Sequence, residues 1–229
     1  MARTLLVVCT ANVCRSRYAE AVITSLGAGD WSVVSAGVRS GDDLTVCSRV
    51  AERLSGSPQE RVAAGAATTL REAHVLAADL ILTAERAHRS AVNRLVPEAR
   101  ARTFTLREFV DLVDQFGWTD PTDVVGSLAD LDRARPRLVI RVPVVDPLQR
   151  MRARHAGPGS LLDIDDGHEA GRWKHARVLD EIESVSAAVA SILSTVPDEA
   201  PPHGPSPASS RGRHRDGPRG RWHNRRSRG

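Results

Sequence analysis

Aromatic residues, lysine and cysteine are all scarce in this chain of 229 residues, and long apolar runs are missing from it. Aromatics make up only 3% of the sequence, so a hydrophobic core must be built mainly from valine, leucine, isoleucine and alanine. No apolar stretch approaches the roughly 20 residues that cross a membrane, so we expect no membrane insertion. The 41% of hydrophobic residues is enough for one globular domain.

The three cysteines form no Cys-x-x-Cys pair and no cluster with histidine along the sequence. This odd number without paired spacing argues against a disulfide framework and against a zinc site. We therefore expect a cytoplasmic protein that needs no metal and no other cofactor. Lys174 is the only lysine among 32 cationic residues, and such a composition, rich in arginine and alanine, is typical of GC-rich bacterial genomes.

Positive charge is concentrated at the C-terminus. Residues 197–229 hold eight arginines against three carboxylates, a net charge of +5, so −1 remains for residues 1–196 out of the total of +4. The segment is rich in Pro, Gly, Ser and Arg and cannot bury enough apolar surface to fold alone. We expect a disordered tail, either merely solvated or, through its arginines and Trp222, bound to acidic partners or nucleic acid.

Apolar runs alternate with helical patterns along the chain. The runs fall at 5–8, 33–34 and 80–82, and the helical patterns at 17–26, 46–54 and 86–96. Phe104 indicates a fourth strand, followed by helices over 107–116 and 171–196. Alternating signals of this kind predict a single three-layer α/β domain over residues 1–196, with a four-stranded parallel sheet and helices on both faces.

The pattern degrades between residues 117 and 162, where five prolines divide the chain. Residues 123–135 indicate a short charged helix. We interpret 117–162 as an insertion into the domain, and two interpretations stay open: a lid over a functional site, or a passive surface loop.

Residues 8–16, Val-Cys-Thr-Ala-Asn-Val-Cys-Arg-Ser, join the first apolar run to the first helical pattern. Backbone N–H groups at a strand-to-helix turn point into one concavity and hold an anion there. Cys9 shares this concavity with Arg15, and both the helix N-terminus and the guanidinium favour a thiolate. A thiolate in an anion-binding loop suits phosphate-ester chemistry. The alternative is a buried, inert cysteine beside a surface arginine.

The spacing of cysteine and arginine alone is weak evidence for an anion-binding loop, because this chain has so many arginines that the spacing can arise by chance. Cys47 and Arg53 repeat it, within a segment whose apolar residues recur at helical spacing. Amides inside a helix bond one another and cannot bind an anion, so we assign Cys47 to packing. The context of Cys9 is different, because Asn12 tolerates a left-handed backbone and Ser16 is placed to cap the helix or to donate to Cys9.

With these features, residues 8–16 resemble the phosphate-binding loop of the low-molecular-weight protein tyrosine phosphatases. Residues 35–37 (Ser-Ala-Gly) resemble the segment after that family's second strand. Residues 78–88 resemble its third strand and following helix. The resemblance covers about 3–110 and 163–195, and the loop is expected between the first strand and the first helix.

The resemblance implies hydrolysis of phosphotyrosine in proteins through a phosphocysteine, with Cys9 as nucleophile and a phosphorylated protein, such as a bacterial tyrosine kinase, as partner. The residues that would bind the phosphate are Thr10, Ala11, Asn12, Val13, Cys14, Arg15 and Ser16. Cys14 is either a partner for a reversible disulfide with Cys9 or a small apolar filler of the loop.

The family's general acid is an aspartate in an Asp-Pro pair before the last helix. Asp146 has the proline, whereas Asp166 is followed by Gly167 but lies at the family's distance from that helix. We favour Asp166, with Asp165 as the neighbouring alternative in register. His168 and Glu169 stand where the family often has tyrosines, which leaves the selectivity for phosphotyrosine open.

Two other functions remain open at the level of sequence. The first is arsenate reduction on the same fold, although the paired distal cysteines that this chemistry needs are missing. The second is a non-catalytic module that binds phosphate or phosphopeptides.

Overall fold

The structure is a computed structural model that describes residues 3–41, 44–118, 120, 123–140, 157–168 and 171–195. Its elements in chain order are β1 (Arg3–Cys9), α1 (Arg15–Leu26), β2 (Trp31–Gly37), α2 (Ser48–Leu54), α3 (Glu60–Ala64), α4 (Glu72–Ala77), β3 (Leu80–Thr83), α5 (Arg86–Leu95), η1 (Pro97–Arg102), β4 (Thr103–Thr105), α6 (Leu106–Phe116), α7 (Val124–Ala134), η2 (Arg135–Arg137), η3 (Pro158–Leu162) and α9 (Arg172–Ser194).

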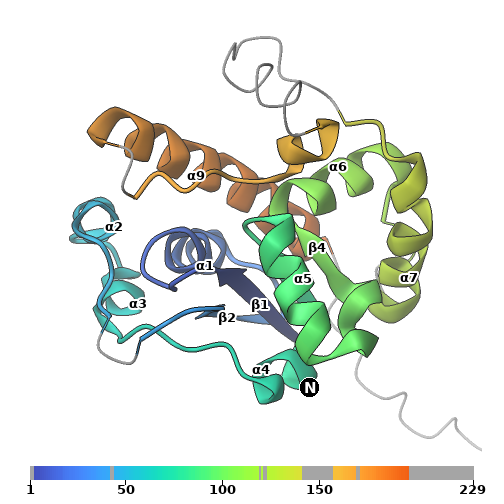
Figure 1. The fold of residues 1–229 in the computed structure, drawn as a ribbon, viewed down its shortest axis with the longest axis horizontal. Helices are drawn as coiled ribbons and strands as arrows, with labels where there is room; N and C mark the ends of the chain where they lie inside the picture. Colours follow the sequence, from blue (N-terminus) through green and yellow to red (C-terminus); the bar gives the residue numbers. More distant parts are fainter. Residues whose placement is uncertain are drawn as a thin grey trace, which may run out of the picture. The chain divides into compact units, whose positions relative to one another are not determined.

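The four strands form one parallel sheet in the order β2-β1-β3-β4 (Figure 1). Leu5 of β1 lies between Val33 of β2 and Leu80 of β3. Because β1 is an inner strand covered on both faces, its sequence is a continuous apolar run rather than an alternating one. The predicted fold class, a three-layer α/β domain with the loop between the first strand and first helix, is confirmed.

Alternate residues of each strand serve two hydrophobic cores. Leu5 and Val7 face the core formed with α1, α6 and α9, whereas Leu6 and Val8 face the smaller core formed with α4 and α5. All four side chains are at most 1% exposed. The carboxyl ends of the strands therefore meet between two helical layers, where ligands bind in open α/β sheets.

The helix boundaries differ from the sequence predictions mainly at N-termini. The helix predicted over 46–54 begins at Ser48, so Cys47 is its N-cap and not an interior residue. Two short helices, α3 and α4, were not predicted, because five- and six-residue segments carry too few turns for a periodic pattern.

The helix expected over 123–135 is α7, whose apolar face packs against α6 and η1. Residues 141–156 and 196–229 lie outside the described residues, so the interpretations of the insertion and of the tail stay predictions. Among the helices described, none is long and apolar enough to span a membrane.

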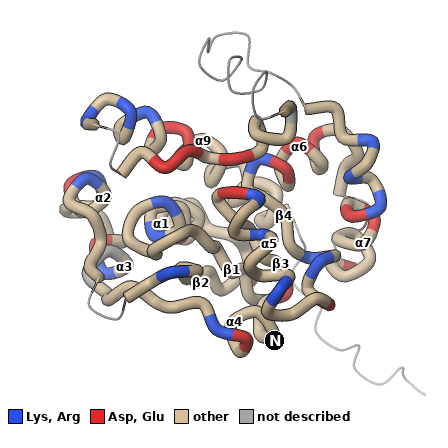
Figure 2. The backbone as a smooth tube through the Cα atoms, in the orientation of Figure 1, with Lys and Arg blue, Asp and Glu red and all other residues tan. Residues whose placement is uncertain are grey.

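Helices α2 and α9, far apart in sequence, are joined by ion pairs. Arg53 of α2 binds Asp180 and lies 3.0 Å from the Glu183 carboxylate of α9. Figure 2 shows acidic positions along α9 and charged positions on α2. Arg53, which repeats the Cys-to-Arg spacing after Cys47, therefore joins two helices at the surface. This agrees with the assignment of its segment to packing.

Candidate active site

Cys9 is the last residue of β1, and its side chain is buried beneath the loop that leads into α1. Its Sγ lies 3.0 Å from the Ser16 hydroxyl oxygen and accepts a hydrogen bond from the Asn12 backbone N–H at 3.3 Å. Asn12 has a φ of 56°, which confirms the predicted left-handed conformation. Because the Ser16 hydroxyl accepts from the Asn12 side chain, its own proton is free to donate to the sulfur, so two donors can converge on Cys9.

The Asn12 side chain holds the loop from within. Its amide nitrogen donates to the Ser16 hydroxyl at 2.9 Å and to the Ser35 hydroxyl at 2.7 Å, and its oxygen accepts from the Thr68 N–H at 2.8 Å. Asn12 is fully buried, so each of these bonds satisfies a polar group that water does not reach. One residue therefore connects the loop to β2 and to the segment before α4.

Replacing Asn12 by alanine is expected to destabilise the fold by about 2–4 kcal/mol, because buried partners lose their hydrogen bonds. Asn12→Gly is the matched control, since glycine adopts the left-handed backbone without the steric cost of alanine. We expect it to be about 1 kcal/mol less destabilising than Asn12→Ala. Urea unfolding of both variants tests this, and equal losses would contradict a contribution from the backbone.

Gly37, at the end of β2, packs directly against the backbone of the loop after β1. A Cβ atom there would lie 2.7 Å from the Ala11 carbonyl carbon and 2.7 Å from the Asn12 nitrogen. No side chain fits between this strand end and the loop, so the close approach of two backbones explains the glycine at position 37.

Arg15, the first residue of α1, is buried and has four partners. Its Nη1 donates to the Ile164 carbonyl at 3.0 Å and to the Glu85 carboxylate, and its Nη2 donates to the Thr10 hydroxyl at 3.0 Å and to Asp166 Oδ2 at 2.6 Å. The guanidinium is therefore oriented from both sides. Burial alone would lower the pKa of Arg15, but Cys9 and the two carboxylates outweigh it and raise that pKa.

The segment that carries Asp166 is anchored to the turn between β3 and α5. Asp163 accepts from the Arg86 backbone N–H at 2.7 Å and from Arg86 Nη2 at 3.0 Å, and the Ile164 N–H donates to the Ala84 carbonyl at 2.8 Å. These contacts bring residues from distant parts of the sequence to one edge of the sheet, the edge at which Cys9 lies.

Gly167, which replaces the family's proline, packs against the start of α9. A Cβ atom at this position would lie 3.0 Å from the His175 Cα and 3.0 Å from Val178 Cγ2. The expectation from sequence considered only the flexibility of glycine, whereas the structure adds that a side chain at this position would require the start of α9 to shift by a few tenths of an ångström. The Asp166 carboxylate also accepts from the His168 N–H at 3.0 Å, which fixes its second oxygen.

The candidate acids are separated by their positions. Asp166 lies at Arg15, whereas Asp165 faces away toward Lys174, 3.8 Å from its Nζ. Asp146 lies outside the described residues. Of the aspartates weighed from sequence, Asp166 is thus the one that the described structure brings to the phosphate loop.

A pocket of about 460 Å³ opens above these groups. It is lined by Cys9, Thr10, Ala11, Val13, Cys14, Arg15, Asp166 and His168. The other two predicted phosphate-binding residues, Asn12 and Ser16, are fully buried behind the sulfur and support it rather than line the pocket.

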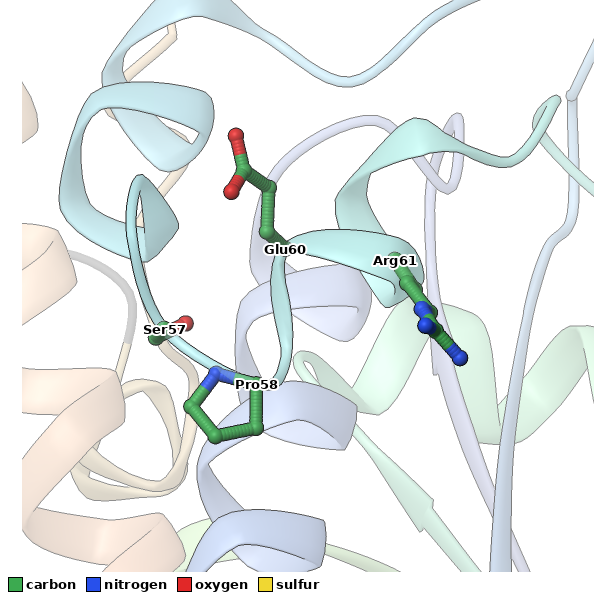
Figure 3. A pocket seen from close by; sticks show the side chains of 4 residues that line it. All are labelled: Ser57, Pro58, Glu60 and Arg61. Atoms are coloured by element: carbon green, nitrogen blue, oxygen red, sulfur yellow. The ribbon is translucent and has the colours of Figure 1, made fainter.

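A larger pocket, of about 720 Å³, lies at the turn between α2 and α3 (Figure 3). Its lining residues are Ser57, Pro58, Glu60 and Arg61. Glu60 and Arg61 are exposed and point in different directions, and the Glu60 carboxylate accepts from the Gly56 N–H of its own turn at 3.2 Å. The chemistry-bearing groups gather instead at the loop after β1.

The model of the family "Low molecular weight phosphotyrosine protein phosphatase" matches residues 4–138. The chain belongs to this family. It is therefore a relative of protein phosphatases that depend on a cysteine.

Individual relatives of the phosphatase family fall into two groups by name. A protein-arginine-phosphatase of Geobacillus stearothermophilus is 32% identical over 133 residues, which cover 55% of this chain and 86% of that protein. The solved structure of a YwlE arginine phosphatase mutant with a phosphorylated active-site serine has a TM-score of 0.55 at 20% identity, covering 84% of this chain and 96% of that one. A low-molecular-weight protein tyrosine phosphatase from T. tengcongensis also has a TM-score of 0.55 at 20% identity, covering 82% and 98%. The two structures support the fold alone.

Three further residues that the sequence left without a role contact this candidate site, namely Glu85, His88 and Asp163. Glu85 and His88 occur in the segment that resembles the family, but their partners come from the loop after β1. His88 Nε2 lies 2.9 Å from the Thr10 hydroxyl oxygen. Burial lowers the pKa of His88 from 6.5 to about 4, so the ring is neutral near pH 7.

This buried histidine predicts a stability that depends on pH. Between pH 6.5 and about 4 the unfolded chain binds a proton at His88 that the folded chain does not, so stability is lost as the pH falls through this window. The expected loss from this group is up to about 3 kcal/mol. Urea unfolding of the wild type and of His88→Gln across this range checks it. The difference between the two should change with pH, and a constant difference would contradict the prediction.

Proposed function

We propose that this chain hydrolyses phosphotyrosine in proteins through a phosphocysteine intermediate on Cys9. The observation that carries the proposal is the pair of donors on the Cys9 sulfur, in a pocket whose other walls hold Arg15 and Asp166. A nucleophile, a guanidinium for the phosphoryl oxygens and a carboxyl group for the leaving oxygen are the three parts that this reaction needs.

In the first step the Cys9 thiolate attacks phosphorus and forms the S–P bond while the P–O bond to tyrosine breaks. Arg15 and the backbone N–H groups of the loop, other than that of Asn12, hold the three remaining phosphoryl oxygens. The start of α1 suits this task, because its N-cap, Cys14, makes no side-chain cap hydrogen bond. Protonated Asp166 gives its proton to the departing phenolate oxygen.

In the second step a water attacks the phosphocysteine, and Asp166, now a carboxylate, takes its proton. The S–P bond breaks, and inorganic phosphate leaves with the thiolate regenerated. Ser16 and Asn12, as donors to the sulfur, stabilise the negative charge that returns to it.

Asp166 contacts the same nitrogen of Arg15 on which a phosphoryl oxygen would bind. Binding of substrate therefore requires this carboxylate to leave Nη2 and turn toward the leaving group. The Asp166 side chain is 54% exposed and turns by giving up exposed contacts with Arg15 and the His168 N–H, whereas the Arg15 side chain, 3% exposed and bound to Glu85 on its other nitrogen, stays in place.

The walls of the pocket support an aryl phosphate as the proposed substrate. Ala11, Val13 and the His168 ring provide apolar or flat surfaces for a phenyl group. A phosphoarginine side chain instead carries several N–H donors, and the pocket lining offers one carboxylate, Asp166, for them.

Phosphoarginine is the second candidate substrate, and the relationship to a protein-arginine-phosphatase favours it. Two peptides of one sequence, carrying phosphotyrosine or phosphoarginine at the same position, decide between them when phosphate release is followed. We expect kcat/KM to be about tenfold or more higher for phosphotyrosine. A preference for phosphoarginine would transfer the proposal to that substrate, and release from neither peptide would overturn it.

The proposed acid is tested by Asp166→Asn, which keeps the shape of the side chain but cannot donate the proton. We expect kcat on the phosphotyrosine peptide to fall about 10²-fold or more, and less on an aryl phosphate whose phenol is more acidic, because such a leaving group needs less protonation. Asp165→Asn is the matched control and should stay close to wild type. If Asp146→Asn alone lowers turnover, Asp166 is not the acid.

A further inference from the structure

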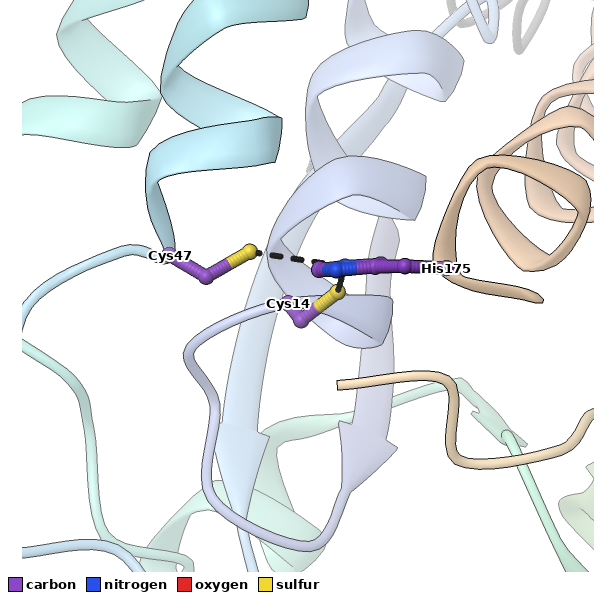
Figure 4. A group of neighbouring side chains, drawn as sticks. All are labelled: Cys14, Cys47 and His175. Atoms are coloured by element: carbon purple, nitrogen blue, oxygen red, sulfur yellow. Dashed lines mark hydrogen bonds between the residues drawn. The ribbon is translucent and has the colours of Figure 1, made fainter. Parts of the chain in front are cut away.

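Three buried side chains that the phosphatase chemistry does not use converge beside the phosphate loop (Figure 4). Cys14 precedes α1, Cys47 precedes α2, and His175 lies in the first turn of α9. His175 Nε2 is 3.1 Å from the Cys14 Sγ and 3.7 Å from the Cys47 Sγ. The three ligand atoms all lie within 4.8 Å of one another, and no residue of the three is more than 9% exposed.

These separations match those around a small tetrahedral ion. Zn²⁺ binds sulfur at about 2.3 Å and imidazole nitrogen at about 2.0–2.1 Å, so neighbouring ligand atoms in a tetrahedral site are roughly 3.5–3.8 Å apart. Of the observed sulfur-to-nitrogen distances, 3.7 Å lies within this range and 3.1 Å lies below it. Small side-chain rotations are enough to let one ion contact all three atoms.

The ligand types select the metal. Thiolate and imidazole ligands favour zinc and other soft or borderline ions over magnesium and calcium, which prefer oxygen. Two thiolates and one neutral imidazole also balance the charge of a divalent ion, which matters because an unbalanced charge at a buried site is costly.

We propose that Cys14, Cys47 and His175 form a zinc-binding site. Binding releases the two thiol protons to solvent and forms two Zn–S bonds and one Zn–N bond. The fourth position is taken from the side of the catalytic pocket, since Cys14 also lines that pocket. The ion then connects α2 and α9 to the phosphate loop, and this connection stabilises the fold.

No spacing along the chain predicts this site, because its ligands lie in three different elements. The sequence expectation of no zinc site considered only ligands that are near one another in sequence. Cys47, whose segment was assigned to packing, supplies one of the ligands. Its side chain points toward His175 of α9.

Cobalt(II) is the test probe, because thiolate ligands give it charge-transfer bands and tetrahedral geometry gives it intense visible bands. The titration is done on the full chain carrying Cys9→Ser, with a phosphine reductant present. In this background Cys14 and Cys47 are the only thiols, so the bands report on them and not on the nucleophile. We expect saturation at one cobalt per chain and loss of the bands when zinc is added.

Two further variants identify the ligands. Adding Cys47→Ser should abolish the charge-transfer bands, and adding His175→Gln should weaken cobalt binding about tenfold or more. His74→Gln, at a histidine of α4 outside the cluster, is the control and should leave the titration unchanged. Thermal unfolding with a chelator present verifies that each variant is folded, and zinc should raise the melting temperature of the Cys9→Ser chain and of its His74→Gln control but not that of the chain with Cys47→Ser added.

Several results would overturn the site. These are the absence of charge-transfer bands in the reduced Cys9→Ser chain, or bands that persist after Cys47→Ser. A Cys14–Cys47 disulfide in aerobically prepared protein, together with no cobalt binding after reduction, would assign the two thiols to redox chemistry instead. None of these readouts depends on phosphatase activity, so the site and the proposed function fail or stand separately.

Discussion

The Cys9→Ser variant is expected to lose about 10⁴-fold or more in kcat on a phosphotyrosine peptide, because an alcohol supplies almost no anion to attack phosphorus at neutral pH. The serine hydroxyl is small enough to keep the contacts with Ser16 and Asn12, so the loop should retain its shape. Phosphate release gives the rate, and inhibition of the wild type by added variant, through competition for the peptide, shows whether the variant still binds it.

Ser16→Ala tests the contribution of the Ser16 hydroxyl separately from that of the Cys9 nucleophile. This variant keeps the Cys9 sulfur but loses the hydroxyl 3.0 Å from it, so we expect an intermediate loss of about 10–100-fold in kcat. The order wild type, Ser16→Ala, Cys9→Ser is the expected ranking. A Cys9→Ser variant as active as the wild type would remove Cys9 from the mechanism.

Arg15→Lys is expected to lower kcat/KM by about 10³-fold, although the charge is conserved. The planar guanidinium binds Glu85 and Ile164 through one nitrogen and points the other into the pocket. An ammonium group cannot hold a carboxylate behind it and two phosphoryl oxygens in front of it in one plane. Initial rates on the phosphotyrosine peptide, with inorganic phosphate as a competing ligand, measure the loss of both catalysis and anion binding.

The chain contains its own control for this experiment. Arg53 follows Cys47 at the same spacing, but it forms ion pairs with α9 on the surface. Arg53→Lys should therefore stay within about twofold of the wild-type rate, since exposed ion pairs contribute little. Equal losses in the two variants would mean that the Arg15 effect is one of folding and not of phosphate binding.

The parts of the site that are local in sequence could be predicted from it. Cys9, Asn12, Arg15 and Ser16 lie within eight residues, and strand, turn and helix signals constrain how they are arranged. The left-handed Asn12 and the contact of Ser16 with the sulfur both follow from residue type and position.

Contacts between distant segments could not be predicted in the same way. Glu85 and His88 have ordinary helix-start sequences, and only the order β2-β1-β3-β4 brings the end of β3 next to that of β1. Gly167 is a second example of a contact between distant segments. A side chain at this position would press against α9, and the residues around Gly167 in the sequence do not show that contact. Cys47 was assigned to a helix interior because the end of a helix is poorly fixed by apolar periodicity.

The distance in sequence between the nucleophile and the proposed acid has a consequence for the order of biosynthesis. Cys9 emerges among the first residues of the chain, whereas Asp166 comes more than 150 residues later and is held in place only when Asp163 reaches Arg86 and α9 packs on α1. A nascent chain can therefore bury its reactive sulfur early but cannot complete a working site until nearly the whole domain has left the ribosome. The proposed acid step is thus confined to chains whose synthesis has passed the segment around Asp166.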